Sequence, residues 1–221
     1  MPTVSFDSNS DRIWAVMSQF IGNDYGTAGL MGNIWAESGW KPDNMENVGT
    51  QFGWTDASYT QAVNDGTESF TRIYHIPRGD GTYQDRCLGY GICQWTSAGR
   101  KQGLYNLKQS QGVLIQNIDM QLDWLKYELS NGYSHVLTAL QSAPSVRVAS
   151  DYVLEHFERP GGWDTPAVQE LRADYGTQVY LHYNGSPPPT PPTPGSCDYR
   201  LVIGKFRHKR KNAVSRFKYK R

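Results

Sequence analysis

The side chain best placed to do chemistry is Glu37, near the end of a predicted helix in the segment GLMGNIWAESGW. With 100° between successive helical residues, Glu37 lies within about 60° of Leu30 and Ile34, so its carboxyl borders the buried face. Apolar surroundings disfavour the charged form of a carboxyl group and raise its pKa. A carboxyl that keeps its proton near neutral pH can protonate a leaving oxygen as a general acid. Position alone favours a solvated glutamate at the helix edge, and two further segments change that balance.

The segment that follows Glu37, SGWKPDN (38–44), has the composition of a helix stop. Its Gly and Pro end the helix, and Trp40 is then expected to lie beside the carboxylate. The chain is rich in such rings, since its 7 Trp, 14 Tyr and 7 Phe make up 13% of it. Aromatic rings stack on flat ligands such as sugars, although most of them must fill the core and the surface.

The second segment, LGYGICQW (88–95), carries groups that suit a polar ligand. Gly89 and Gly91 let a ligand approach the backbone closely, and Tyr90 lies between them. Gln94 offers both a donor and an acceptor, which suits sugar hydroxyls or an N-acetyl group. Taken alone, the segment fits an ordinary glycine-rich turn with a buried Trp equally well.

The elements that must position these residues are helices toward both ends of the chain and an irregular segment between them. Apolar spacing and capping residues predict five helices. They cover residues 10–21, 27–37, 114–130, 145–157 and 165–182, with Ser10, Thr27 and Ser145 as N-caps and Thr165-Pro166 as the last start. The clearest pattern is that of 114–130, whose apolar residues keep near-heptad spacing from Leu114 to Leu129.

Residues 40–93 are rich in Gly, Asn, Asp, Thr and Tyr. Within them, FTRIYHI (70–76) and YQDRCL (83–88) flank a Gly-containing turn and predict a β-hairpin. Helices, an irregular β lobe and then a helical bundle predict an α+β fold. We expect it to be mostly helical, with a small β-hairpin lobe and a cleft between the lobes.

The charge is divided unevenly along the chain, although its net value is only +1. Residues 198–221 hold ten of the 22 Lys and Arg side chains and one of the 21 acidic ones, which leaves 12 basic and 20 acidic side chains for the rest. We expect a globular catalytic domain at 7–184, a proline-rich linker at 185–196 and a flexible basic tail at 197–221.

The composition excludes several classes of protein. With 38% hydrophobic and 19% charged residues the chain can form a packed core, so wholesale disorder is not expected. No apolar run approaches the roughly 20 residues of a transmembrane helix, and MPTVSFDSNSDR lacks the pattern of a signal peptide. The five His and three Cys have no metal-ligand spacing, so no metal or cofactor is predicted. A disulfide between Cys87 and Cys93 stays open as an alternative.

Four motifs occur in order along the chain: AGLMGNIWAESG (28–39), Met45-Glu46-Asn47, GYGICQWT (89–96) and FERPG (157–161). In this combination the chain resembles the phage tail lysozyme family of the lysozyme-like superfamily, whose members cleave peptidoglycan. The resemblance covers about residues 10–184 and does not extend to the linker or the tail. We expect FERPG to be structural, with Phe157 closing the core, Arg159 pairing with an acid and Pro160 helping to end a helix.

The resemblance implies a glycoside hydrolase that cleaves the β-1,4 bond between N-acetylmuramic acid and N-acetylglucosamine. Glu37 matches the catalytic acid of the family, and Trp40, Tyr90, Gly91 and Gln94 are expected to bind the sugar. The glycan strands of peptidoglycan are then the substrate, and neither metal nor cofactor is implied. The expected site of action is the cell wall, reached from a phage tail or by release without a signal peptide.

Glycosidases usually need a second carboxylate that activates water or stabilises the oxocarbenium charge. Glu46 matches the Leu-Glu-Asn element of the family, and Asp43, Asp56 and Asp85 are alternatives on nearby predicted loops. If none of them faces the cleft, a lytic transglycosylase that leaves a 1,6-anhydro product becomes the better interpretation. A non-catalytic wall-binding module with a cationic tail is a further alternative.

The basic tail has three interpretations: a solvated extension, a segment attracted to anionic wall polymers or a membrane surface, and a nucleic-acid-binding segment. Dense Lys and Arg interleaved with Phe206, Phe217 and Tyr219 suit the second of these. Nucleic acid is ranked last, because a peptidoglycan hydrolase has no need of it.

Overall fold

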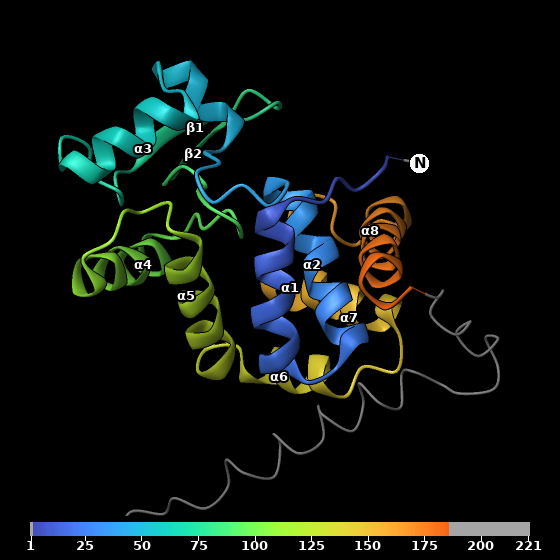
Figure 1. Ribbon diagram of the computed structural model, residues 1–221. Coiled ribbons are helices and arrows are strands. Elements are labelled where there is room, and N and C mark those ends of the chain that lie inside the picture. The colour runs from blue at the N-terminus through green and yellow to red at the C-terminus, as the bar shows by residue number, and fades with distance from the viewer. Residues whose placement is uncertain (1, 186–221) are drawn as a thin grey trace, which may run out of the picture. The chain divides into compact units, whose positions relative to one another are not determined.

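Helix α2 (Asp24–Ser38) lies at the centre of the larger part of the molecule and carries Glu37 near its C-terminal end (Figure 1). Every residue from Gly26 to Ile34 is buried. A helix that is surrounded by protein in this way has no polar face to turn toward water. The computed structural model describes residues 2–185.

Four helices pack around α2. They are α1 (Ser8–Ile21), α6 (Ser134–Gln141), α7 (Val146–Val153) and α8 (Pro166–Asn184). A π-helical turn, Leu154–Glu158, continues α7 and ends at Arg159, whose φ of 50° lies in the left-handed region. Glu158 is therefore the last helical residue before the chain reverses its direction.

Glycines on α2 allow its neighbours to approach to backbone contact. A Cβ on Gly29 would lie 2.5 Å from the Cβ of Ala149 on α7, and one on Gly32 would lie 2.4 Å from the backbone nitrogen of Gly176 on α8. Both distances are far below van der Waals contact, so neither position can carry a side chain without moving its neighbour. The contact between Gly32 and Gly176 thus fixes where α2 crosses α8.

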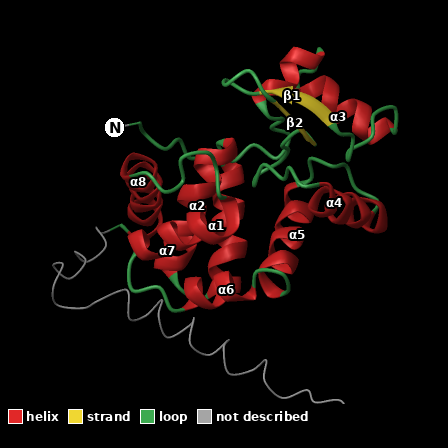
Figure 2. Ribbon diagram, turned by 180° about the vertical axis from the view of Figure 1, so that it is seen from behind, coloured by secondary structure: helices red, strands yellow, loops and turns green. Residues whose placement is uncertain are grey.

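The smaller lobe is formed by the chain between α2 and α4. It contains a 3-10 turn (Asn47–Phe52), helix α3 (Asp56–Asp65) and strands β1 (Tyr74–Pro77) and β2 (Tyr83–Arg86). The strands are antiparallel, with Tyr74 opposite Arg86 and Pro77 opposite Tyr83. Figures 1 and 2, seen from opposite sides, both show α3 and the strands together and apart from α6, α7 and α8.

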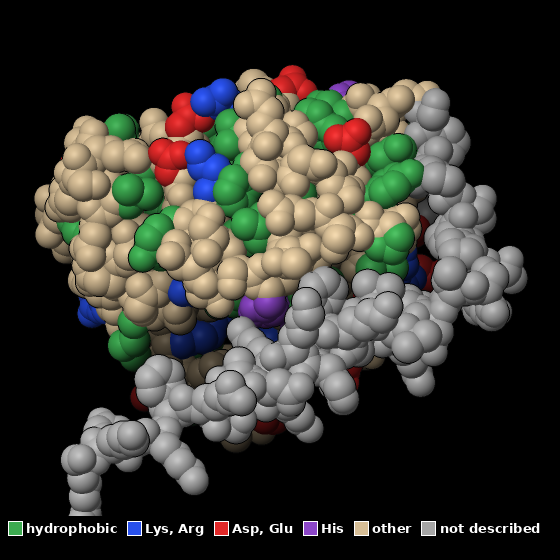
Figure 3. Space-filling model, turned by 90° about the horizontal axis from the view of Figure 1, so that it is seen from below, with side chains coloured by type: hydrophobic (Ala, Val, Ile, Leu, Met, Phe, Trp, Pro, Cys, Tyr) green, Lys and Arg blue, Asp and Glu red, His purple; other side chains and the backbone are tan. Residues whose placement is uncertain are grey.

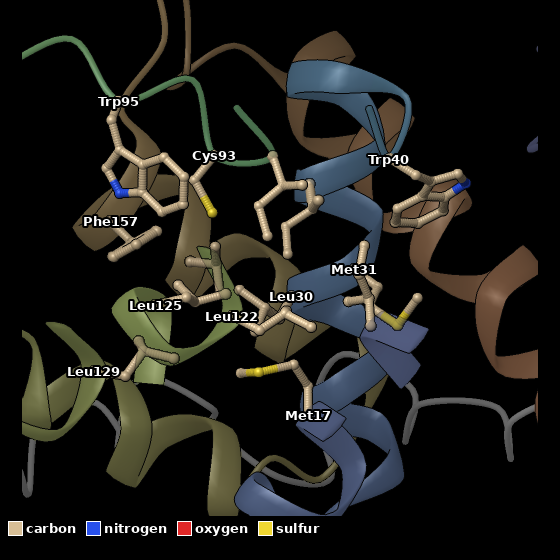
Figure 4. Close-up of a cluster of buried hydrophobic side chains, with 14 of the residues drawn as sticks. Met17, Leu30, Met31, Trp40, Cys93, Trp95, Leu122, Leu125, Leu129 and Phe157 are labelled. Carbon is tan, nitrogen blue, oxygen red and sulfur yellow. The ribbon is translucent and has the colours of Figure 1, made fainter. Parts of the chain in front are cut away.

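Helices α4 (Ala98–Gln111) and α5 (Ile118–Ser130) follow the lobe and pack against each other, and α5 also contacts α1 and α6. The buried cluster in Figure 4 joins these helices to α2. Its members include Met17, Leu30, Leu122, Leu125, Leu129, Cys93, Trp95 and Phe157. Figure 4 also shows Trp40 on the opposite side of α2 from Trp95 and Cys93.

On the face of the molecule shown in Figure 3, Lys and Arg are interspersed with Asp and Glu, and the hydrophobic side chains are scattered between them. That mixture is typical of a surface in contact with water. Among the residues that the structure describes, no helix is both long enough and apolar enough to cross a membrane.

The predicted α+β fold class, with a small hairpin beside a helical majority, is confirmed. Two predicted helix starts are wrong. The cap of α1 is Asp7, whose side chain accepts the backbone N–H of Ser10, so Ser10 lies inside the helix. The cap of α2 is Asn23, and Thr27 is a buried residue one turn further on. Asn is a stronger N-cap than Thr, and Asp7 and Ser10 together form a capping box in which Asp7 is the cap.

The helix predicted at 114–130 begins only at Ile118, because Asn117 caps it and the exposed Leu114 precedes it. The starts at Ser145 and at Thr165-Pro166 are confirmed, and the hairpin forms at the predicted place with shorter strands. Helices α3, α4 and α6 were not predicted. The buried face of α4 carries Lys101 and Lys108 beside Leu104, so its sequence lacks apolar spacing.

Helix α8 ends at Asn184, where Gly185 adopts a left-handed conformation as its C-cap. The predicted linker beyond that glycine and the predicted basic tail, 197–221, lie outside the described residues.

Candidate active site

A cleft of about 780 Å³ lies between the end of α2 and the hairpin lobe. Its walls come from the end of α2, from residues 44–48, from β2, from the loop 93–96, from α4 and from the turn after α7. Three carboxylates line it: Glu37, Glu46 and Glu158. The sequence analysis predicted that Glu37 and Glu46 belong to one site, but it did not include Glu158 in that site.

Glu37 stands in the last turn of α2, which ends because Gly39 adopts the left-handed conformation. Its side chain is 16% exposed, and its Oε1 lies 2.5 Å from Nη2 of Arg172 on α8. The other guanidinium nitrogen of Arg172 donates to Asn33 Oδ1 at 3.2 Å. The sequence predicted apolar neighbours for Glu37, and the structure adds a buried cation that forms an ion pair with it.

Glu46 lies on the wall formed by the smaller lobe and is held by Arg86 of β2. The two guanidinium nitrogens donate to its two oxygens at 2.5 and 2.6 Å, and the backbone N–H of Gly89 donates to Oε2 at 3.0 Å. Burial by itself raises the pKa of Glu46, but the bonds from Arg86 and Gly89 outweigh it and lower that pKa below its ordinary value. Glu46 is therefore a carboxylate over the whole neutral range.

Glu158 reaches the same cleft from the π-helical turn after α7. Its Oε1 is buried and has no hydrogen-bond partner among the described residues. Burial, followed by the negative charge of Glu37, raises the pKa of Glu158 to about 8. The sequence signal for Glu158 was the FERPG motif, which contains it, but the sequence analysis assigned that motif a structural role.

The guanidinium of Arg100 forms its ion pair with a different carboxylate, that of Glu128. It donates to both oxygens of Glu128 on α5, at 2.6 and 2.9 Å, and lies 4.5 Å from the centre of the Phe157 ring. The indole N–H of Trp95 donates to the same carboxylate at 2.8 Å. Both charged groups act on Glu158 electrostatically, but the hydrogen bonds of Arg100 go to Glu128.

Gln94 lines the cleft, as the sequence predicted for a sugar contact. Its φ of 44° is left-handed, and its amide nitrogen donates to the carbonyl oxygens of Asn44 and Gly91. The amide is thereby fixed in one orientation, with its oxygen near Gly89. A fixed amide at the wall of a polar cleft can present an acceptor to a hydroxyl or amide of a ligand.

The structure does not bring Trp40, Tyr90 or Gly91 to the cleft. Trp40 and Tyr90 have no exposed surface: the indole of Trp40 donates to the carbonyl of Ser5, and the hydroxyl of Tyr90 bonds with Thr60. Gly91 is buried in a turn with a φ of 78°. The expectation that these three residues contact the sugar is therefore corrected to a structural role, because their side chains or backbone fill the core beside the cleft.

None of the alternative second carboxylates lines the cleft. Asp56 accepts the backbone N–H of Met45 at the start of α3, and the exposed Asp85 pairs with His75 on the other face of the hairpin from Arg86. Asp43 is also absent from the cleft wall. Of the four candidates named from the sequence, Glu46 is the one that the fold places beside Glu37.

The open question of a Cys87–Cys93 disulfide is answered by the structure, in which both are free and buried. Burial raises the pKa of each thiol, and that of Cys93 lies well above its usual range. Within residues 2–185, no three His, Cys, Asp or Glu side chains gather as metal ligands would.

Carboxyl groups on opposite walls of a cleft are the arrangement that most glycosidases use, and here the walls come from a helical body and a small β lobe. The fold and the site together define the lysozyme-like class. A family model described as phage tail lysozyme matches residues 8–183, and the chain belongs to that family. Comparison with curated protein sequences finds no significant match. The chain is thus a lysozyme-like enzyme of the cell wall whose substrate is peptidoglycan.

Proposed function

We propose that the chain hydrolyses the β-1,4 bond between N-acetylmuramic acid and N-acetylglucosamine in peptidoglycan, with Glu37 as the general acid. The observation that carries the proposal is the placing of Glu37 and Glu46 on two walls of one cleft, each held by its own arginine. A glycan strand in that cleft has a proton donor on one side and a fixed negative charge on the other.

In this mechanism Glu37 gives its proton to the glycosidic oxygen as the bond to the anomeric carbon breaks. Positive charge then develops on the sugar ring, and the carboxylate of Glu46 stabilises it. Water attacks the anomeric carbon, directly assisted by Glu46 or through a second water. Arg86 fixes the position of Glu46, and the amide of Gln94 is available to orient the sugar substituents.

The test is mass spectrometry of the soluble products released from purified peptidoglycan, with wild type beside Glu37→Gln. We expect products with a new reducing end from the wild type and a loss of at least about 100-fold in the variant. The matched control is Glu170→Gln, which changes an exposed glutamate on α8 away from the cleft. A Glu37→Gln variant that folds normally and retains the wild-type rate would remove Glu37 from the mechanism.

A lytic transglycosylase is the second candidate, and one observation favours it. Both oxygens of Glu46 already accept hydrogen bonds from Arg86, which weakens Glu46 as a base toward water. A transglycosylase needs no such base, because the muramic acid hydroxyl attacks internally. Its products end in 1,6-anhydro-muramic acid and are lighter by one water molecule, so the same mass spectra separate the two reactions. Binding to peptidoglycan without any soluble product would instead favour a wall-binding module.

The proposal for the basic tail depends on its charge alone. The ten Lys and Arg side chains of 198–221 would attract anionic polymers of the cell wall. The rest of the chain has 12 basic and 20 acidic side chains, so its net negative charge would not. We infer that the tail raises the concentration of the enzyme at the wall and takes no part in bond cleavage.

A further inference from the structure

Glu158 enters the cleft through unusual backbone. The residue ends a π-helical turn, a rare element that occurs mostly as a single turn and is frequent at functional sites. Arg159 then takes a φ of 50° and a ψ of 49°, a left-handed conformation that is uncommon for an arginine. Strain of this kind persists where the surrounding structure enforces it, and here it accompanies the delivery of one carboxyl group to the cleft.

The cations near Glu158 are engaged elsewhere. Arg172 pairs with Glu37, and Arg100 donates twice to Glu128. The Oε1 atom of Glu158 is left buried without a partner. An ionised carboxylate in that position would lack compensation for its lost hydration, whereas a protonated carboxyl has far less to lose.

The charges that face Glu158 come from four elements. Glu37 of α2 and Glu128 of α5 raise its pKa, in addition to the larger effect of burial. Arg100 of α4 and Arg172 of α8 lower the pKa of Glu158, but burial and the negative charges outweigh them. The neutral thiol of Cys93 packs in the same region and has a raised pKa of its own, in part through Glu158. At neutral pH the cleft therefore holds the protonated carboxyl of Glu158 together with Glu37 and Glu46, each of which forms an ion pair with an arginine.

A general acid must carry a proton when the substrate is bound, yet Glu37 is held in an ion pair with Arg172. We propose that Glu158 holds the proton that Glu37 delivers, so that these two carboxyl groups share a single proton in the cleft. Glu158 is then a positioning residue that acts through Glu37. This inference depends on the proposed function, in which Glu37 is the acid.

The proton balance of the cycle closes. The proton moves across the cleft from the carboxyl of Glu158 to the carboxylate of Glu37, directly or through one water molecule. Glu37 then transfers it to the glycosidic oxygen as the C–O bond breaks. The water that attacks the anomeric carbon releases one proton on forming the new C–O bond. That proton returns to the pair and restores Glu158, so neither an external acid nor any other reactant is required.

The experiment is the pH dependence of the cleavage rate on purified peptidoglycan for the wild type and Glu158→Gln. Above the pKa of an acid, each pH unit lowers its protonated fraction about tenfold. Without the proton reservoir, the alkaline limb of the profile is expected to move to lower pH by at least about one unit. The rate at pH 7.5 then falls about tenfold or more, and most of it returns at pH 5.

A merely structural role gives a different pattern, in which the rate of Glu158→Gln falls equally at all pH values together with the melting temperature. That pattern, or an unchanged profile, would overturn the inference. Glu158→Asp keeps the carboxyl group and should restore the alkaline limb in part. Glu37→Gln distinguishes failure of the proposed function from failure of the proton sharing. If Glu37→Gln stays active, the proposed function fails. If Glu37→Gln is inactive while Glu158→Gln keeps the wild-type pH profile, only the proton sharing fails.

Carbon-13 NMR of the glutamate carboxyl groups gives a test that does not depend on activity. We expect one carboxyl resonance of the wild type to titrate above pH 7 and to be missing from Glu158→Gln. If every glutamate resonance of the folded wild type titrates below pH 6, the proton is not held at Glu158.

Discussion

The electrostatic environment of each carboxyl group in the cleft is set by the group that faces it. Glu46 has an arginine on both oxygens, Glu37 has an arginine on one, and Glu158 has no partner on its buried oxygen. Carboxyl groups whose surroundings push their pKa values apart can divide the roles of acid and charge stabiliser between them. The chemistry of this site therefore depends on its arginines as much as on its glutamates.

Arg86→Met tests this dependence at Glu46. Without the guanidinium, burial is the larger remaining effect, and the pKa of Glu46 rises. Because Glu46 acts as a carboxylate, the acid limb of the pH–rate profile should move to higher pH. The cleavage rate at pH 5 is expected to fall on the order of tenfold, since a protonated Glu46 no longer stabilises positive charge on the sugar.

The matched control is Arg78→Met, which removes an exposed arginine from the turn of the same hairpin. It should leave the profile unchanged. An acid limb that stays in place in Arg86→Met would mean that Glu46 has no role as a charge in the reaction.

Sequence alone could point to Glu37 and Glu46, because both lie in short motifs and helical spacing places Glu37 next to Leu30 and Ile34. It could not identify Arg172 as the partner of Glu37, because the two residues are 135 positions apart. The helix that carries Arg172 was predicted only from the residues at its start. Nor could the sequence identify Glu158, whose importance depends on the absence of a nearby partner. Trp40 was misplaced because a left-handed φ of 69° turns its ring into the core, and no pattern of residue types reveals that angle.

At the scale of secondary-structure elements, the crossing of α2 and α8 sets the distance between Glu37 and Arg172. The backbones meet at Gly32 and Gly176, one turn from each of the two charged side chains. The site is thus assembled from a contact in which no side chain takes part.

Gly32→Ala should disturb both stability and catalysis. The new Cβ would lie 2.4 Å from the nitrogen of Gly176, so α8 must shift and carry Arg172 away from Glu37. We expect a loss of about 1–3 kcal/mol in the free energy of unfolding, as for other overpacked cores, together with a reduced rate. Chemical denaturation and cleavage assays on the same samples measure the two effects.

Gly99→Ala is the control for that change, because a Cβ at Gly99 on α4 meets no atom within 4 Å. Its stability should be equal or slightly higher, since Ala favours helix over Gly. Equal stability of Gly32→Ala and Gly99→Ala would contradict the tight crossing.

The elements themselves were predictable where a cap and an apolar stripe agreed. The starts of α7 and α8 follow from Ser145 and from Thr165-Pro166, and the hairpin follows from its turn. The start of α2 was misplaced by a turn because Asn23, and not Thr27, caps the helix. Helix α4 was missed because Lys101, a charged residue type, occupies its buried face.

At the scale of the whole molecule, Lys101 links stability to pH. Its side chain has no exposed surface, and its Nζ bonds to the Tyr59 hydroxyl at 3.0 Å and the Leu88 carbonyl at 2.8 Å, above the ring of Phe70. Burial lowers the pKa of Lys101 to about 7. The unfolded chain, with an ordinary lysine, binds that proton up to a pH of about 10.5.

Between pH 7 and pH 10.5 the unfolded state holds one more proton than the folded state at this residue, so the contribution of Lys101 to stability becomes more favourable as pH rises. Below pH 7 the cost of burying Lys101 is present in full. Lys101→Met should remove this dependence: its gain in the free energy of unfolding over the wild type is largest near pH 7, on the order of a few kcal/mol, and declines toward pH 10.

Denaturant titrations across that pH range provide the measurement. Lys41→Met changes an exposed lysine and should show the same pH dependence as the wild type. If the difference between Lys101→Met and the wild type is constant from pH 7 to pH 10, Lys101 keeps an ordinary protonation state in the folded protein.

The backbone contact between α2 and α8 also has a consequence for motion. Glu37, Arg172 and Glu158 belong to helices that are packed on one another, whereas Glu46 and Arg86 belong to the smaller lobe. A hinge movement that widened the cleft to admit a glycan strand would separate the two lobes but carry each ion pair along intact. Glu37 and Glu46 would each keep its arginine in the open and the closed state, so these charges are in place before the substrate arrives.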